Sequence, residues 1–371
     1  MAPAQAVIPW GFDADASAPL PPLGRLLADC GRFGLTRSVL LVPTGRAARA
    51  QEALAELSQV APLPDVRLVE VRAPHAPAAL SEIKSLLDAH FALFDPAIVL
   101  DGNWLNLVPK LADADDALAL VPGTGPFALI NGRAAARTDD GAPGFMAMAV
   151  AMLRRDALMP AAAAPNIPAM LLQLTQDTSV AACVFAGSQI LPACDGLPVR
   201  PPRPALFLDR DGTLNEDYGY VSDPDRLVLL PGAAAAVKRA NDLGWYVFLV
   251  TNQSGVGRGY YEEAQVLLCN ATLQDQLRAR GAHLDDIRYA PDHPEALLPR
   301  YRSTSDWRKP GPGMLIDLMA HWPVRREASL MVGDKASDVD AGTAAGIRSL
   351  LFSGGDLDTF LAPHLQPVIA P

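Results

Sequence analysis

The stretch Ala205-Leu-Phe-Leu-Asp-Arg-Asp-Gly-Thr213 places a short apolar run directly before two carboxylates that are separated by one residue. The run 205–208 predicts a buried strand, and Gly212 allows the chain to bend sharply after it. Parallel α/β sheets bind their ligands at the carboxyl ends of the strands. We therefore expect Asp209 and Asp211 to project into one site at such an edge.

The same pattern continues to the end of the chain, where apolar runs alternate with helical stretches. This alternation indicates the α/β class with a doubly wound parallel sheet. The predicted strands are 205–208, 246–250, 287–290, 329–332 and 349–352, and the predicted helices are 233–243, 262–280, 313–321 and 337–345.

Polar residues follow the other predicted strands as well. Thr251-Asn-Gln-Ser-Gly255 offers hydroxyl and amide groups to phosphate oxygens, and Arg308-Lys-Pro310 adds two cations. Gly333-Asp334-Lys335 ends another strand, and Asp338 lies one helical turn beyond Asp334. The set suits phosphoryl transfer, in which a carboxylate attacks phosphorus while Mg²⁺ and a lysine screen the charges. Mg²⁺ prefers oxygen ligands, so two carboxylates and a main-chain carbonyl suffice.

These four motifs resemble those of the haloacid-dehalogenase-like (HAD) superfamily. Over about 205–352 the residues within these motifs are similar to those of the subfamily of D-glycero-D-manno-heptose-1,7-bisphosphate 7-phosphatases and histidinol-phosphatases. The resemblance implies a Rossmann-like unit without a large cap, with Asp209 as nucleophile and Asp211 as general acid and base. It also implies that Asp209, Asp334 and the main-chain carbonyl of Asp211 hold Mg²⁺, while Asp338 orients the metal shell or Lys335.

The resemblance also implies the groups that hold the substrate. Thr251 and Lys309 would bind the phosphoryl oxygens, and Asn252 and Arg308 belong to the same substrate-binding set. Arg258 is expected either to meet a second anionic group of the substrate or to be an ordinary solvated arginine.

One departure concerns a structural zinc site that the subfamily usually carries. Its pattern Cys-Pro-His-His-Pro followed by Cys-x-Cys is replaced by Ala290-Pro-Asp-His-Pro294 and Ser305-Asp-Trp307. Because the thiolates that make such sites tight are missing, no zinc is expected. We expect the loop to be held instead by packing of Trp307 and Pro294.

The amino-terminal half also alternates, and it resembles sugar-phosphate nucleotidyltransferases at 6–9, 19–24 and 99–103. Strands are predicted at 6–8, 38–42, 66–71, 97–100 and 117–121, and helices at 23–33, 47–57, 78–94 and 145–152. The resemblance implies a nucleotide-binding loop at 10–16, where Asp13 and Asp15 would repel phosphates. Asp101 alone could bind a metal. We therefore expect a degenerate nucleotidyltransferase-like domain that no longer transfers nucleotides.

Length and composition limit the number of domains and the kinds of partner that the protein can have. A chain of 371 residues favours two domains, and five prolines within 192–204 predict a stiff linker between domains at 1–191 and 205–371. The net charge of −10, shared by both halves, argues against nucleic acid or anionic membrane as the main partner. The lack of a long apolar run predicts a cytoplasmic protein, and the four scattered cysteines predict small core residues rather than disulfides.

Together these features predict a Mg²⁺-dependent phosphatase acting on a small phosphorylated metabolite. Heptose 1,7-bisphosphate is the favoured substrate, because partners that resemble sugar nucleotidyltransferases belong with sugar-phosphate pathways. Three alternatives stay open: a histidinol-phosphatase, a catalytically silent sugar-phosphate-binding scaffold, and a bifunctional nucleotidyltransferase-phosphatase.

Overall fold

The computed structural model describes residues 3–12, 23–59, 63–96, 98–100, 102–123, 125–137, 144–158, 163–185, 190–192 and 201–368. The chain folds as two compact units, residues 1–198 and 199–371. Within the described ranges, no helix combines the length and apolar character needed to cross a bilayer.

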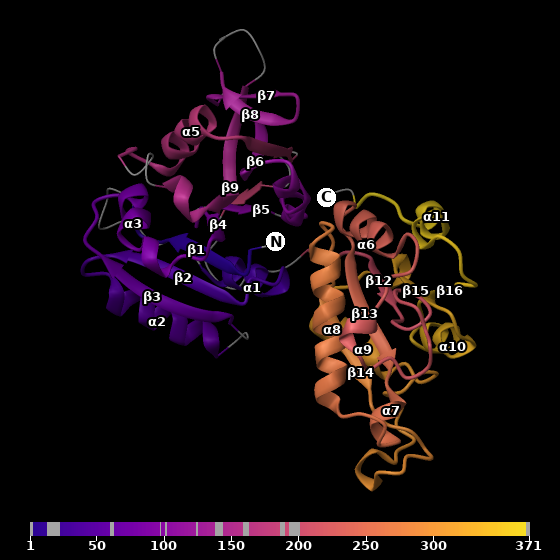
Figure 1. The fold of residues 1–371 in the computed structure, drawn as a ribbon. Helices are drawn as coiled ribbons and strands as arrows, with labels where there is room; N and C mark the ends of the chain where they lie inside the picture. Colours follow the sequence, from indigo (N-terminus) through magenta and orange to yellow (C-terminus); the bar gives the residue numbers. More distant parts are fainter. Residues whose placement is uncertain are drawn as a thin grey trace. The chain divides into compact units, whose positions relative to one another are not determined.

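The C-terminal unit is built on a five-stranded sheet in which every pairing is parallel (Figure 1). The chain first winds outward from the central strand β12 to β13 and β14, and then returns to place β15 and β16 on the other side of β12. Ligand sites form where the winding direction reverses, so the carboxyl end of β12 is favoured. The strands are β12 (Ala205–Leu208), β13 (Tyr246–Asn252), β14 (Asp286–Ala290), β15 (Leu330–Gly333) and β16 (Arg348–Leu351).

Helices cover both faces of this sheet, as expected for a doubly wound fold. Leu206 and Leu208 pack on one side in a core with α6, α8 and α11, whereas Ala205 and Phe207 pack on the other side with α9 and α10. This period of two is the pattern of a strand buried on both faces. The helices are α6 (Ala233–Asp242), α7 (Ser254–Gly257), α8 (Glu263–Arg278), α9 (Gly313–His321), α10 (Ala336–Ala344) and α11 (Leu357–Leu361).

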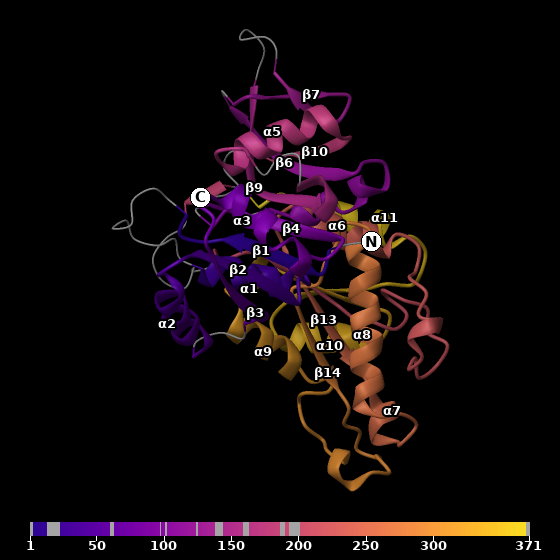
Figure 2. The same ribbon diagram turned by 60° about the vertical axis from the view of Figure 1, so that its left-hand side comes forward.

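Figures 1 and 2 both place α7 and the loop after β14 at one end of this unit, beside the N-terminal end of α8. Both segments continue directly from carboxyl ends of strands. This end of the unit therefore carries the segments that the sequence marks as functional.

The N-terminal unit contains a nine-stranded mixed sheet of order β3-β2-β1-β4-β9-β6-β10-β8-β7 and a small pair β11-β5. Two apolar cores lie on the two faces of the sheet, and each buried strand residue belongs to only one of them. The strands are β1 (Gln5–Pro9), β2 (Arg37–Pro43), β3 (Asp65–Val71), β4 (His90–Phe94), β5 (Ile98–Leu100), β6 (Asp116–Gly123), β7 (Phe127–Ile130), β8 (Arg133–Ala136), β9 (Gly144–Arg154), β10 (Val180–Val184) and β11 (Ile190–Pro192). The helices are α1 (Gly24–Arg32), α2 (Ala47–Ser58), α3 (Ala76–Glu82) and α5 (Ile167–Asp177). The positions of Asp13, Asp15 and Asp101 lie outside the described residues.

The prediction of one helix over 78–94 is wrong. Helix α3 ends at Glu82, a 3₁₀ turn follows at Lys84–Leu86, and His90–Phe94 forms strand β4. β4 pairs with β1 on one side and β9 on the other, so its apolar residues are needed inside the sheet. The local apolar pattern fits either element, and the pairing partners decide between them.

The prediction of a core helix at 145–152 is also wrong, because these residues lie in β9. Alanine and methionine favour helices, but β9 is bonded to both β4 and β6. Val150 and Met152 face one core while Ala151 and Leu153 face the other. Tertiary context therefore overrides the intrinsic helix propensity of this segment.

Candidate active site

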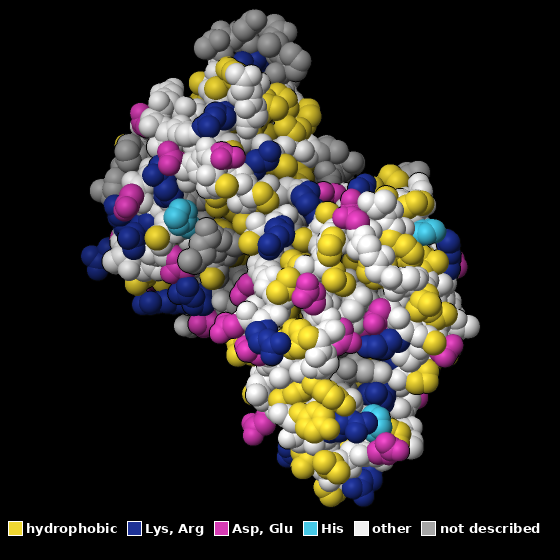
Figure 3. Space-filling model, turned by 45° about the vertical axis from the view of Figure 1, so that its right-hand side comes forward, with side chains coloured by type: hydrophobic (Ala, Val, Ile, Leu, Met, Phe, Trp, Pro, Cys, Tyr) yellow, Lys and Arg dark blue, Asp and Glu magenta, His cyan; other side chains and the backbone are white. Residues whose placement is uncertain are grey.

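Loops that follow neighbouring strands form one pocket at the carboxyl edge of the five-stranded sheet. Asp209 follows β12, Thr251 lies near the end of the adjacent β13, and Lys309 arrives from the segment before α9. These side chains and those of Asp211 and Arg308 line a cavity of about 590 Å³. Figure 3 shows the surface of this end of the unit, where basic, histidine and hydrophobic side chains lie side by side.

Lys309 forms the buried electrostatic centre of the pocket. Its Nζ lies 2.6 Å from Oδ1 of Asp209, 2.6 Å from Oδ1 of Asp338 and 2.7 Å from the main-chain oxygen of Val250. Burial works against the charge of Lys309, but Asp209 and Asp338 raise its pKa, so the ammonium stays protonated. Burial raises the pKa of Asp209 to about 6, with Lys309 acting in the opposite direction. One buried lysine thus faces more than one buried carboxylate, and the surplus negative charge favours a further cation.

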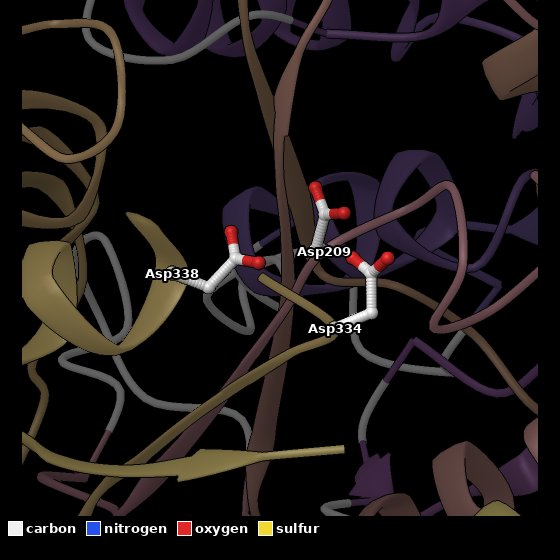
Figure 4. Close-up of side chains that lie close together, drawn as sticks. All are labelled: Asp209, Asp334 and Asp338. Atoms are coloured by element: carbon white, nitrogen blue, oxygen red, sulfur yellow. The ribbon is translucent and has the colours of Figure 1, made fainter. Parts of the chain in front are cut away.

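Asp209, Asp334 and Asp338 can each offer an oxygen within 4.8 Å of the others, the one such acidic group found among the described residues. Figure 4 shows these carboxylates converging from separate segments of the chain. Asp338 has both oxygens engaged, Oδ1 by Lys309 and Oδ2 by the main-chain N–H of Lys335. By contrast, Oδ1 of Asp334 is buried without a hydrogen-bond partner, and burial raises the pKa of this carboxyl, with Lys335 opposing. Asp209 and Asp334 therefore fit a hard divalent cation better than Asp338 does.

Gly212 explains how the loop after β12 approaches Asp334 so closely. It adopts φ +87°, and a Cβ at this position would stand 2.4 Å from Oδ2 of Asp334. No side chain fits in that space, so glycine is required both by the backbone conformation and by the carboxylate beside it.

Asp211 lines the cavity with its carboxylate held by side-chain donors on both oxygens. Asn215 donates to Oδ1 at 2.9 Å and Gln253 donates to Oδ2 at 3.0 Å, while the Arg210 guanidinium bonds to both. Gln253 is in turn fixed by the hydroxyl of Tyr261, which donates to its Oε1 at 2.9 Å. This arrangement keeps the carboxylate in a defined orientation beside the cavity.

Asn252, which the sequence predicts to bind substrate, lines the cavity, and its amide also holds the main chain of Lys309. Its Nδ2 donates to the main-chain oxygen of Lys309 at 2.9 Å, and its Oδ1 accepts the Lys309 N–H at 3.1 Å. Thr251 is buried and its hydroxyl oxygen accepts a hydrogen bond from Gln253. The structure thus places both Thr251 and Asn252 in the pocket wall, where Asn252 also fixes the main chain of Lys309.

One wall of the cavity carries concentrated positive charge. Arg308 and His293 line the cavity, and the Arg258 guanidinium lies 3.3 Å from Nε2 of His293, outside the lining set. Burial lowers the pKa of Arg308, and Arg258 adds to this effect. Burial likewise lowers the pKa of His293, with Arg308 and Arg258 contributing. An anionic group placed here would relieve the repulsion between the two guanidinium groups.

The loop after β14 is fixed by hydrogen bonds and packing. Trp307 packs against the sheet core and its indole donates to the main-chain oxygen of Tyr289 at 2.9 Å. Glu263, on α8, accepts hydrogen bonds from the hydroxyls of both Tyr289 and Tyr301. Pro294, in the same loop, lines the cavity. Glu263 was missed in the sequence because nothing local links it to tyrosines that lie 26 and 38 positions away.

The sequence did not indicate a role for two other residues of the site, Arg210 and Asn215. Gln253 belongs to the polar cluster that the sequence analysis singled out, but its hydrogen bond to Asp211 was not predicted. Arg210 lies between two predicted catalytic acids, which is the one signal that could have drawn attention to it. Tyr220 also lines the cavity, and its ring contacts that of Tyr260 edge-on, with ring centroids 4.7 Å apart.

Comparison with known proteins gives matches for both parts of the chain. Residues 306–367 match the HAD-hydrolase-like family model. The chain is 48% identical over 161 residues to the D-glycero-beta-D-manno-heptose-1,7-bisphosphate 7-phosphatase of Rhodopseudomonas palustris, a match that spans 43% of this chain and 89% of that relative.

Two solved structures cover different shares of the chain. The D,D-heptose 1,7-bisphosphate phosphatase from B. bronchiseptica, complexed with magnesium and phosphate, is 32% identical with a TM-score of 0.38 and covers 43% of this chain and 86% of its own. HddC from Yersinia pseudotuberculosis is 13% identical with a TM-score of 0.40 and covers 51% of this chain and 92% of its own.

Proposed function

The chain belongs to the family of HAD-like heptose-bisphosphate 7-phosphatases, and on this premise we propose that it hydrolyses D-glycero-D-manno-heptose 1,7-bisphosphate with Mg²⁺ as cofactor. The observation that carries the proposal is the buried contact between Lys309 Nζ and Asp209 Oδ1 at the carboxyl end of the central strand. It holds a nucleophilic carboxylate in place and reduces the charge that a phosphate must approach.

The reaction follows from the groups that surround this pair. The other oxygen of Asp209 attacks phosphorus, an aspartyl-phosphate bond forms, and the bond from phosphorus to the sugar oxygen breaks. Asp211 gives a proton to the departing sugar oxygen. Water then attacks the aspartyl phosphate and returns a proton to Asp211, which releases phosphate and restores the Asp209 carboxylate.

The residues present fit a bound Mg²⁺. Asp209, Asp334 and the main-chain carbonyl of Asp211 would hold it, and Asp334 Oδ1 is the buried oxygen still without a partner. When bound, Mg²⁺ supplies positive charge that offsets the repulsion between the carboxylates and the phosphoryl oxygens. Asp338 keeps Lys309 in position through its own ion pair.

The charged wall supports a bisphosphate substrate. While one phosphoryl group lies at Asp209, a second would meet Arg308, with Arg258 and His293 behind and beside it. Histidinol phosphate is the second candidate, since its phosphate suits the same pocket. It carries an ammonium group where the bisphosphate carries a phosphate, and two guanidinium groups repel a cation.

The experiment is a comparison of phosphate release by the full chain with Mg²⁺. The substrates are heptose 1,7-bisphosphate, histidinol phosphate and a panel of sugar monophosphates. We expect preference for the bisphosphate, and a loss of roughly 10³-fold or more in Asp209→Asn. Asp358→Asn, which changes an exposed ion pair with Arg239, is the matched control and should retain activity.

Preference for histidinol phosphate would replace the substrate and keep the chemistry. No release from any phosphate ester would leave the silent scaffold as the better description. Formation of a nucleotide sugar from a nucleoside triphosphate and a sugar phosphate would add the bifunctional interpretation.

A further inference from the structure

Arg210 lies between the two carboxylates of Asp209-Arg-Asp211, yet none of its surface is exposed. Its guanidinium makes two parallel hydrogen bonds with Asp211: Nε donates to Oδ1 and Nη2 donates to Oδ2, each at 3.0 Å. Such a planar fork fixes the orientation of a carboxylate as well as its distance. The proposed reaction assigns no step to this arginine.

Two groups outside the Asp209–Asp211 segment also hold the guanidinium of Arg210. Nη2 also donates to the main-chain oxygen of Val221 at 2.8 Å, and Nη1 donates to Oδ1 of Asn270 at 3.1 Å. Asn270 is itself buried within α8. Arg210 therefore cannot turn without breaking contacts to both α8 and the loop at Val221.

The hydrogen-bond donors on the buried side of the Asp211 carboxylate differ in charge from the donor on its cavity side. Each carboxylate oxygen accepts one hydrogen bond from Arg210 and one from a neutral amide, Asn215 at Oδ1 and Gln253 at Oδ2. Gln253 lines the cavity together with Asp211, whereas Arg210 is fully buried. The charged donor thus lies behind the carboxylate. On the cavity side of Oδ2 there is a neutral amide, whose hydrogen bond a substrate oxygen or a water can replace at modest cost.

We propose that Arg210 is a positioning residue that holds Asp211 from behind, so that Oδ2 faces the leaving oxygen and then the attacking water. This inference rests on the proposed function, because it concerns the acid and base of that reaction. The proton passes from Asp211 Oδ2 to the sugar oxygen and returns to Oδ2 from water. Arg210 gives and takes no proton, and it keeps its two bonds to Asp211 throughout.

The dependence of the rate on the leaving group separates this role from a purely structural one. A general acid speeds the departure of a sugar alkoxide, which needs a proton, and contributes little to the departure of dinitrophenolate, which does not. The measurement is the single-turnover rate of leaving-group release, with Mg²⁺, from the sugar bisphosphate and from dinitrophenyl phosphate. Asp211→Asn sets the reference pattern, with a loss of roughly 10²–10⁴-fold on the sugar phosphate and a small loss on the aryl phosphate.

Arg210→Met keeps a long side chain but removes every donor. We expect it to show the selective pattern of Asp211→Asn, with a loss of about tenfold or more on the sugar phosphate alone. The double variant should be as slow as Asp211→Asn, because Arg210 acts through Asp211. Arg239→Met is the matched control: Arg239 makes the same two-bond fork with Asp358, at 2.7 Å for each bond, on the exposed surface of this unit. It should keep wild-type rates on both substrates.

Equal losses on both substrates, or losses that multiply in the double variant, would overturn the role of Arg210 and leave the proposed function intact. A wild-type protein that releases no leaving group from either ester would overturn both. If Arg210→Met fails to fold, as judged by circular dichroism, Arg210→Lys and Asn270→Ala carry the same comparison. Asn270→Ala removes the Nη1 anchor without touching Asp211, so a smaller loss confined to the sugar phosphate supports the proposal and an equal loss contradicts it.

Discussion

Lys309 and Asp209 form a buried ion pair in which Nζ lies 2.6 Å from Oδ1, with side-chain exposures of 1% and 8%. The same ammonium lies 2.6 Å from Oδ1 of Asp338. A single lysine therefore holds the proposed nucleophile and the first turn of α10 at once. Removing the lysine would leave two buried carboxylates facing each other.

Lys309→Met should therefore destabilise the C-terminal unit by about 3–5 kcal/mol, the usual result of leaving a buried charge unpaired. The free energy of unfolding in urea measures this loss. Lys238→Met is the matched control, since Lys238 pairs with Asp242 at the surface of α6. Exposed pairs contribute about 0–1 kcal/mol, so a loss in Lys309→Met no larger than that of the control would contradict the prediction.

Asp334→Asn should remove stabilisation by Mg²⁺ more than it alters the metal-free protein. Burial raises the pKa of Asp334 and so already disfavours its charge in the metal-free protein, whereas an amide at this position no longer supplies an anionic ligand. At about 100 times the dissociation constant, Mg²⁺ should stabilise the wild-type protein by about 2.7 kcal/mol. Thermal unfolding with Mg²⁺ and with a chelator measures this difference. An unchanged Mg²⁺ response in Asp334→Asn would exclude it as a ligand.

Asn252→Ala should lower kcat by about 10–100-fold with little change in KM, because a displaced Lys309 no longer supports the attacking carboxylate. Asn252→Asp keeps the acceptor for the Lys309 N–H and should fall between the alanine variant and the wild type. Steady-state kinetics separate the two parameters. A rise in KM at constant kcat would instead indicate that Asn252 binds the substrate directly, as the sequence suggests.

Glu263 should make the stability of the C-terminal unit depend on pH. Hydrogen bonds from Tyr289 and Tyr301 lower its pKa in the folded protein. A lowered carboxyl pKa contributes stability that is complete above the unfolded value, about 4.3, and is lost as the pH falls through the folded value. Urea unfolding of wild type and Glu263→Gln should therefore differ most above about pH 5 and converge in acid. A difference that grows in acid would refute this account.

The placement of the site could be predicted from sequence to a considerable extent. Asp209, Thr251 and Asp334 follow apolar runs, and the carboxyl ends of parallel strands meet at one edge whatever the loops do. The two hydrogen bonds from Arg210 to Asp211, and those that Glu263 accepts from two tyrosines, could not be predicted in this way. Both depend on which way a side chain points after the backbone has turned, and on partners far away in the sequence.

In the N-terminal unit, even the type of one secondary-structure element could not be predicted from the sequence. Alanine and methionine dominate the sequence of β9 and predict a helix, whereas the bonds to β4 and β6 that make it a strand come from segments that are remote in the chain. Local propensity is weak compared with burial between two neighbouring strands.

The proposed reaction depends above all on a phosphoryl group that is carried by Asp209. The most direct measurement is acid quenching of Asp211→Asn during a single turnover with dinitrophenyl phosphate and Mg²⁺, followed by peptide mass mapping. We predict a phosphoryl group on the peptide that contains Asp209, removed by hydroxylamine as expected for an acyl phosphate, and absent in Asp209→Asn. Release of dinitrophenolate with no phosphorylated peptide at any time point would contradict the account, because the water would then attack the substrate directly.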